Sequence, residues 1–394
     1  MVDEKQIKQW LKDGTITSKQ AQKMLVDSSK YKKEQRSNKF IVTISTIGSI
    51  LVGIGAILFI ASNWQVIPDI LKVLILIGST FAAYFIGYLF CYQNKNLPKV
   101  GASLMFLGAL LFGATILLIA QIYNINANSH LLVLIWLIGV LPMVYAFASL
   151  PIAGLSSLLF FVWIGLLVFR NIDFGRAYGD FFALPVLYIA AGITLFAAGG
   201  LHYFYKKFSG VARIYRLAGI KVILLSLFLL TFRLFSGNYD GFNIRENAII
   251  SSQFRVGLVI FSILAILLTV INWFFNKTEE ISMIEHPTNL ALTVFVLIFF
   301  FFPSATTNIY VLLFNIIFVG LLVLMLYAGY RREDMRLINL GVFWLSAFII
   351  FKYFDFFWKL LHRSLFFIIG GLILVLGGIA LEKKRRELKK KFKD

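Results

Sequence analysis

The chain consists mainly of about a dozen apolar runs, each roughly 20 residues long and separated by short polar segments. An α-helix needs about 20 apolar residues to cross the hydrocarbon core of a bilayer. The runs are too long and too continuously apolar for barrel strands, which cross with about 9–11 residues of alternating character. We place the predicted spans at 40–61, 70–92, 99–121, 130–148, 150–169, 182–204, 214–235, 253–275, 288–303, 308–329, 336–354 and 364–381.

Composition strengthens this prediction. Hydrophobic residues make up 59% of the 394 residues and charged residues 14%, against about 45–50% and about 25% in a typical soluble domain. Lipid tails accept outward-facing Leu, Ile and Phe side chains that water would not. The predicted fold class is all-α: a polytopic transmembrane bundle of about twelve spans.

Both tails are basic, and this sets the expected orientation. Residues 1–39 hold 10 of the 38 Lys and Arg residues, and residues 382–394 hold 8. Cytoplasmic flanks of membrane spans are enriched in Lys and Arg, so we expect both termini in the cytoplasm and an even number of spans. The net charge of +19 then indicates contact with anionic lipids at the cytoplasmic face, and no nucleic-acid partner is needed to explain it.

The N-terminal segment predicts a small helical hairpin. Ile7, Trp10 and Leu11 share one helical face, and Thr17 with Gln20 forms a capping box for a second helix. The hairpin is either a folded cap on the cytoplasmic side or a docking module for a protein partner. The predicted domains are therefore a hairpin at 1–38, a transmembrane domain at 39–382 and a basic tail at 383–394.

Polar side chains concentrate at the ends of the runs that this orientation places outside. If those ends converge, they line an outward-facing pocket with a cationic bias, suited to a small or lipidic anion. The alternative is that they are interfacial anchors, with Lys352 and Asp355 forming a self-satisfied ion pair at i, i+3. The candidate ligand-binding residues are Asn63, Trp64, Arg233, Arg255, Lys352, Asp355, His362 and Arg363.

Other polar residues in the runs have simpler interpretations. Arg216, Lys221 and Arg336, near the predicted inner ends, are expected to extend toward lipid phosphates. Asn272, Asn315 and Asn339 are expected to form hydrogen bonds between helices. Repeats of small residues also predict close helix packing: Ser45, Ser49 and Gly53; Ala109 and Gly113; Gly370 and Gly377.

The sequence offers little for catalysis. It contains no phosphate-binding G-x-x-x-x-G-K-[ST] loop, no H-E-x-x-H helix and no G-x-S-x-G turn. Its four His residues and single cysteine, Cys91, show no metal-ligand spacing. We predict no catalytic residues, no metal and no cofactor, and a non-enzymatic protein more readily than an enzyme.

Three stretches resemble a known family. They are Gln9-Trp10-Leu11-Lys12-Asp13-Gly14-Thr15-Ile16-Thr17 with Ala21; Ala61-Ser62-Asn63-Trp64 with Ile67-Pro68 and Lys72; and Lys352-Tyr353-Phe354-Asp355 with Arg363-Ser364, Gly370-Gly371 and Arg385-Arg386. Together they resemble the bacterial multi-pass membrane proteins that carry domain of unknown function 2157. The resemblance implies a cytoplasmic helical hairpin before a bundle in a bacterial inner (plasma) membrane. It implies no activity and no site residues.

Three functional hypotheses follow. The first is a carrier or binder of a small or lipidic anion, acting through the outward-facing pocket. The second is a non-enzymatic scaffold or regulatory component that recruits partners through its cytoplasmic tails. The third is an integral-membrane enzyme that modifies lipids. The sequence leaves the oligomeric state open.

Overall fold

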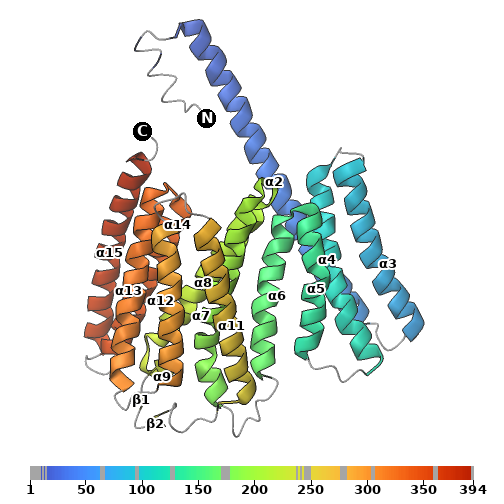
Figure 1. Cartoon of the computed structure of the whole chain (residues 1–394). Helices are drawn as coiled ribbons and strands as arrows, with labels where there is room; N and C mark the ends of the chain where they lie inside the picture. Colours follow the sequence, from blue (N-terminus) through green and yellow to red (C-terminus); the bar gives the residue numbers. More distant parts are fainter. Residues whose placement is uncertain are drawn as a thin grey trace. The chain divides into compact units, whose positions relative to one another are not determined.

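In the computed structural model the chain forms two compact units, Met1–Phe160 and Phe161–Asp394 (Figure 1). The helix α6 (Leu150–Phe169) crosses the boundary between them. Each unit is described by itself. The structure describes residues 10, 13, 16–62, 67–93, 97–124, 129–169, 178–236, 238–239, 242–243, 250–275, 282–302, 307–357 and 363–391.

Unit 1 is built around α4, which packs against α2, α3 and α5. Small residues make these contacts close, as predicted. The Ser49 hydroxyl of α2 donates to the Ser103 carbonyl of α4 at 3.0 Å. The Trp136 indole of α5 donates to the Ala109 carbonyl at 2.9 Å, and its ring fills the space that a side chain at Gly113 would need. The helices are α2 (Ser18–Ser62), α3 (Asp69–Tyr88), the π-helix η1 (Leu89–Gln93), α4 (Pro98–Ile122) and α5 (Ser129–Phe147).

The helix α2 differs from the expected separate hairpin and span. It runs 45 residues without interruption, about 70 Å at 1.5 Å per residue, and its apolar part is the predicted run at 40–61. No Pro or Gly lies between Ser18 and Ser37 to end the helix, so it continues through the predicted boundary at residue 38. The predicted capping box is present at its start: the Thr17 N–H donates to Gln20 Oε1 at 2.9 Å, and the Gln20 N–H to Thr17 Oγ1 at 3.4 Å. Ile7 and Leu11 lie outside the described residues.

Unit 2 is a bundle of longer helices in which α7 packs against α8, α11 and α12, and α13 packs against α8 and α14. Between α8 and α11 two short strands pair antiparallel, with Asn238 opposite Asn243. The elements are α7 (Tyr178–Leu201), the 3₁₀ turns η2 (His202–Phe204) and η3 (Lys206–Phe208), α8 (Ser209–Leu230), α9 (Arg233–Ser236), β1 (Asn238–Tyr239), β2 (Phe242–Asn243), α11 (Ser252–Phe275), α12 (Ser282–Phe301), α13 (Thr307–Arg331), α14 (Met335–Phe357) and α15 (Arg363–Lys391).

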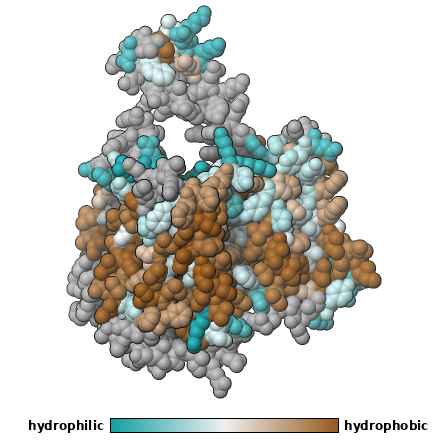
Figure 2. All heavy atoms as spheres, in the orientation of Figure 1, coloured by the Kyte–Doolittle hydropathy of each residue, from teal (hydrophilic) through white to brown (hydrophobic). Residues whose placement is uncertain are grey.

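The helices confirm the predicted class, a helical membrane protein. Hydrophobic side chains cover the middle of the helices on the visible face (Figure 2). Among the described residues, nine helices are long and apolar enough to cross a membrane. The other three predicted spans correspond to the apolar part of α2, to α8 and to α15, so the count of twelve stays a prediction.

Two sequence expectations were wrong in detail. The span predicted at 288–303 is present as α12, but the helix begins earlier, at Ser282, and contains Pro287. A proline inside a helix removes one backbone hydrogen bond and clashes with the preceding turn, so Pro287 weakens the start of α12, although the helix continues through it. The Gly370–Gly377 repeat on α15 packs only in part: a side chain at Gly370 would meet the Tyr353 ring at 2.8 Å, whereas the space beside Gly377 is open.

Candidate functional site

Two polar clusters lie near opposite ends of the bundle in unit 2. Consecutive helices run antiparallel there, so that the end of α7 lies beside the start of α8: a side chain at Gly199 would meet Arg216. We call the group Thr231, Asn315, Lys352 and Asp355 the Lys352 cluster. The group Arg216, Glu285 and Arg332 is the Glu285 cluster. The first contains two of the residues predicted as a ligand site, and the second contains none.

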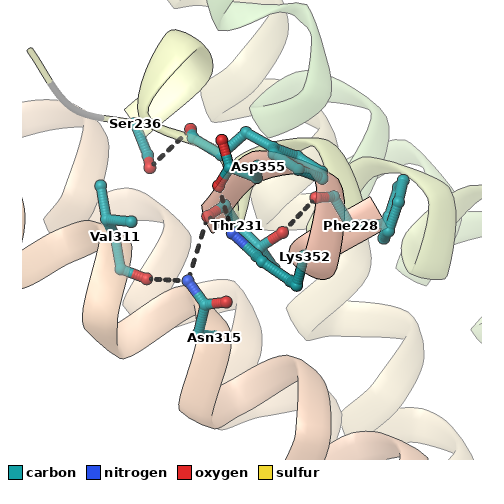
Figure 3. A network of polar contacts seen from close by, with 8 residues as sticks. Phe228, Thr231, Ser236, Val311, Asn315, Lys352 and Asp355 are labelled. Carbon is teal, nitrogen blue, oxygen red and sulfur yellow. Dashed lines mark hydrogen bonds and ion pairs between the residues drawn. The ribbon is translucent and has the colours of Figure 1, made fainter. Parts of the chain in front are cut away.

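The Lys352 cluster is centred on the carbonyl of Thr231, the residue that follows α8 (Figure 3). Lys352 Nζ donates to this oxygen at 2.7 Å, and Asn315 Nδ2 donates to it at 3.0 Å. Lys352 Nζ also lies 3.4 Å from Asp355 Oδ2 and 4.3 Å from the centre of the Phe232 ring. Helices α8, α13 and α14 are therefore joined at one backbone oxygen.

The position of that oxygen explains why a cation lies beside it. The last carbonyls of an α-helix have no partner within the helix, and the peptide dipoles place partial negative charge there. Lys352 supplies a positive charge and a proton donor to this end. Its side chain is 22% exposed, and that of Asp355 is 46% exposed. The arrangement fits a charged cap for α8, and the predicted i, i+3 ion pair between Lys352 and Asp355 is present.

Of the remaining predicted site residues, only Arg233 and Arg255 have described side chains, and neither contacts the Thr231 carbonyl. Arg233 in α9 is exposed and forms no ion pair with a described residue. Arg255 in α11 is exposed and donates to the Ile250 carbonyl at 3.1 Å. Asn63, Trp64 and His362 lie outside the described residues, as does the side chain of Arg363. The enclosure of all eight residues in one pocket stays a prediction.

The Glu285 cluster is a carboxylate held between two guanidinium groups. One oxygen of Glu285 pairs with Arg216 Nη2, and the other accepts from Arg332 Nη1 at 2.7 Å. The three side chains are 18%, 19% and 25% exposed for Arg216, Glu285 and Arg332. Partial burial strengthens such contacts relative to those in open water. The cluster has a formal charge of +1.

Each side chain of this cluster is positioned by its own element. Arg216 in α8 lies 4.4 Å from the centre of the Phe196 ring of α7, within the range of a cation–π contact. Arg332 follows α13, where Glu333 adopts a left-handed backbone with φ of 52° and the Asp334 N–H returns to the Gly329 carbonyl at 2.9 Å. This is a Schellman-type helix end, and it directs the chain so that Arg332 reaches Glu285 in the first turn of α12.

An apolar cavity of about 130 Å³ lies beside the Glu285 cluster, between α7, α8, α12, α13 and the start of α14. Leucine, isoleucine and phenylalanine side chains form most of its wall, and Glu285, Thr288 and Asn289 of α12 supply the polar part. The Thr288 hydroxyl donates to the Ile284 carbonyl at 2.6 Å. The Asn289 Nδ2 atom is buried and has no hydrogen-bond acceptor. A cavity of this size and lining can hold one small apolar group.

Sequence reasoning missed this second site for identifiable reasons. Arg216 was expected to extend to lipid phosphate, but it pairs with Glu285. Glu285 was placed before the predicted span at 288–303, whereas it lies in the first turn of α12. The signal that could have found it is the polar stretch Glu285-His286-Pro287 shortly before an apolar run.

Asp180, which was also outside its predicted span, is completely buried in the first turn of α7. Its Oδ1 accepts from the Ser251 N–H at 2.9 Å, and its Oδ2 has no hydrogen-bond partner. A carboxylate near a helix N-terminus is favoured by the helix dipole. In the described residues, no group of three or more His, Cys, Asp or Glu side chains could hold a metal ion.

Comparison with known protein families gives a match that lies within unit 1. No curated protein and no solved structure matches the chain. The third sequence stretch, around Lys352 and Arg363, lies outside the part that a family model matches. Residues 8–153 match the model of the family described as predicted membrane protein (DUF2157), which confirms over this part of the chain the resemblance predicted from the first two stretches.

Proposed function

We propose that this multi-pass membrane protein binds or carries a lipidic anion in unit 2, at the Glu285 cluster. The observation that carries the proposal is an apolar cavity whose polar wall includes Glu285, the carboxylate that pairs with both Arg216 and Arg332. An amphiphilic anion matches both parts of this site: its hydrocarbon segment would enter the cavity, and its negative headgroup would bind Arg216 and Arg332. Basic pockets between transmembrane helices are a recurring form of anionic-lipid site.

The class of ligand is the one expected from the sequence, but the supported place is different. At the Lys352 cluster the ammonium group already donates to the Thr231 carbonyl and contacts Asp355. At the Glu285 cluster the cations contact a side chain, which can rotate away. A pocket of mostly apolar lining with a few convergent polar groups is the usual form of a small-ligand site.

The proposed orientation places the Glu285 cluster at the cytoplasmic side of a bacterial inner membrane. The end of unit 2 that holds this cluster also holds Lys206, Lys207, Arg331 and Arg336, and cytoplasmic loops are enriched in such residues. With both tails cytoplasmic, as the basic flanks favour, a lipid of the inner leaflet would reach the site.

The test compares two Leu→Trp exchanges on α13. Leu321 lines the cavity, whereas Leu312 is 60% exposed on the same helix. Purified protein in detergent micelles is titrated with phosphatidylglycerol, phosphatidate and phosphatidylcholine, and bound lipid is counted by native mass spectrometry. We expect wild type and Leu312→Trp to prefer the anionic lipids, and Leu321→Trp to lose most of that binding because the indole occupies the cavity. Equal binding of all three lipids, or equal effects of the two exchanges, contradicts the proposal.

A second candidate function is a scaffold that recruits a protein partner through α2. The supporting observation is that residues 18–39 extend the helix about 33 Å beyond its apolar run, at 1.5 Å per residue. Removal of residues 1–36 separates the two functions. A scaffold then loses its partner in pull-downs, whereas a lipid binder keeps its anionic lipid.

A further inference from the structure

We infer that the Glu285 carboxylate competes with the ligand's headgroup for Arg216 and Arg332. We also infer that the ligand is a lipid with a terminal phosphate monoester. This inference rests on the proposed function and adds the headgroup chemistry and the residue that regulates access. In the structure the Glu285 carboxylate occupies both Arg216 and Arg332, one oxygen on each. A headgroup must take the place of that carboxylate to reach the two arginines.

The two arginines are held by contacts that do not depend on Glu285. Arg216 lies over the rings of Phe196, at 4.4 Å, and Tyr203, at 5.6 Å. Arg332 is placed by the helix end at Glu333 and Asp334. When Glu285 rotates away, both guanidinium groups therefore keep their places, and the carboxylate that paired with them no longer balances their two positive charges.

The third donor of the site favours phosphate over carboxylate. Asn289 lies one turn after Glu285 on α12, lines the same cavity, and has a buried Nδ2 without an acceptor. A buried donor left without a partner is unfavourable, so a ligand oxygen that accepts from it gains affinity. A carboxylate headgroup has two oxygens and only reproduces what Glu285 already supplies. A phosphate monoester has three free oxygens, enough for Arg216, Arg332 and Asn289 together.

Charge favours the same headgroup. A phosphate monoester carries about −1.5 to −2 charges at pH 7, which balances two arginines. Guanidinium groups also bind phosphate oxygens in pairs of parallel hydrogen bonds. A phosphodiester, by comparison, carries a single negative charge and has only two free oxygens, because a second oxygen is esterified. We expect phosphatidate to bind more tightly than phosphatidylglycerol for both reasons.

The decisive variant is Glu285→Gln. It keeps the size of the side chain and removes the charge that competes for the arginines. Because the wild-type site is available only when Glu285 has left it, its apparent affinity is reduced by the fraction of time the site is open. We expect Glu285→Gln to bind phosphatidate about tenfold more tightly than wild type, a change of about 1.4 kcal/mol. Arg216→Gln and Arg332→Gln should each weaken binding at least tenfold.

Two further variants control this experiment. Asp355→Asn removes the carboxylate of the Lys352 cluster, away from the proposed site, and should leave phosphatidate affinity unchanged. Asn289→Leu leaves all charges in place and should reduce the preference for phosphatidate over phosphatidylglycerol. It therefore tests the headgroup assignment even if Glu285→Gln fails to fold.

Measurements use the full chain in detergent micelles, titrated with phosphatidate, phosphatidylglycerol and inorganic phosphate. Binding of phosphatidate but not of inorganic phosphate identifies the lipid as the source of the headgroup, whereas equal binding of inorganic phosphate identifies a free-phosphate site. If wild type binds phosphatidate and Glu285→Gln binds it equally or more weakly, the competitor role is overturned. If wild type binds no anionic lipid, the proposed function itself fails.

Discussion

The two polar clusters of unit 2 contain the same kinds of groups but use them differently. Each has a carboxylate beside a cation, near the end of a helix. In the Lys352 cluster the cation donates to a backbone carbonyl, Thr231, which cannot leave its place. In the Glu285 cluster the cations contact a side chain beside an open cavity. An ionisable residue in a membrane helix is therefore a weak guide to a ligand site until its partners are known.

Because of this difference, mutations at the two clusters should affect different properties: the stability of the fold at one and the affinity for lipid at the other. A backbone carbonyl bound by Lys352 and Asn315 joins three helices, so loss of either donor should destabilise the fold without changing lipid affinity. The Glu285 cluster should behave in the opposite way, with a large change of affinity and a smaller change of stability. The predictions below test the Lys352 side of this comparison, in order of decreasing effect.

Lys352→Met should have the largest effect on stability. Methionine keeps an unbranched side chain but removes the charged donor to the Thr231 carbonyl, and hydrogen bonds of charged groups contribute about 1.5–3 kcal/mol. We expect the free energy of unfolding, measured by titration of mixed micelles with sodium dodecyl sulfate, to fall by about 2 kcal/mol. Phosphatidate affinity should stay within twofold of wild type.

Arg255→Gln is the matched control for Lys352→Met, since Arg255 is an exposed cation that donates to a carbonyl at the same end of unit 2. Its loss should change the free energy of unfolding by less than about 0.5 kcal/mol, as expected for an exposed position. If Lys352→Met instead lost lipid binding and kept its stability, the result would indicate that the ligand binds at the Lys352 cluster.

Asn315→Leu should have an intermediate effect. It removes the second donor to the Thr231 carbonyl, at 3.0 Å, and the bond from the same amide to Val311 at 2.7 Å. Hydrogen bonds between membrane helices contribute about 0.6 kcal/mol on average, and leucine replaces the lost packing. The same unfolding titration should therefore show a decrease of about 0.6 kcal/mol. A decrease larger than that of Lys352→Met would show that the amide, not the ammonium group, is the main tie between α8 and α13.

Much of the fold could be predicted from the sequence because a bilayer imposes a length on each helix. Each of the twelve predicted runs overlaps a helix, and the capping box at Thr17 and Gln20 is present. The continuity of α2 could not be predicted from the apolar pattern, because that pattern begins only at Phe40, whereas helix formation also depends on residues that face water. The division at Phe160 had no sequence signal, since α6 crosses it without a polar break.

The site was predictable only in part. The i, i+3 spacing of Lys352 and Asp355 gave their ion pair, and the expected hydrogen bonds of Asn272 and Asn315 to neighbouring helices are present, to the Ala197 and Thr231 carbonyls. The Glu285 cluster joins residues 69 and 47 positions apart, from three different elements. Spacing within one helix contains no information on such contacts. These contacts depend on the packing of α8, α12 and the end of α13 against one another, which the sequence pattern does not specify.

Asp355→Asn should have the smallest effect, and it sharpens the comparison most directly. Asp355 is 46% exposed, and its oxygen lies 3.4 Å from Lys352 Nζ. Exposed ion pairs contribute about 0.2–1 kcal/mol, so we expect a decrease of a few tenths of a kcal/mol in the unfolding titration, reduced further in high salt because ions screen the pair. Lys352 keeps its bond to Thr231 in this variant. If Asp355→Asn instead destabilised the protein as much as Lys352→Met, the ion pair and not the carbonyl would hold Lys352 in place. In both clusters of unit 2 the cations would then be held mainly by a carboxylate.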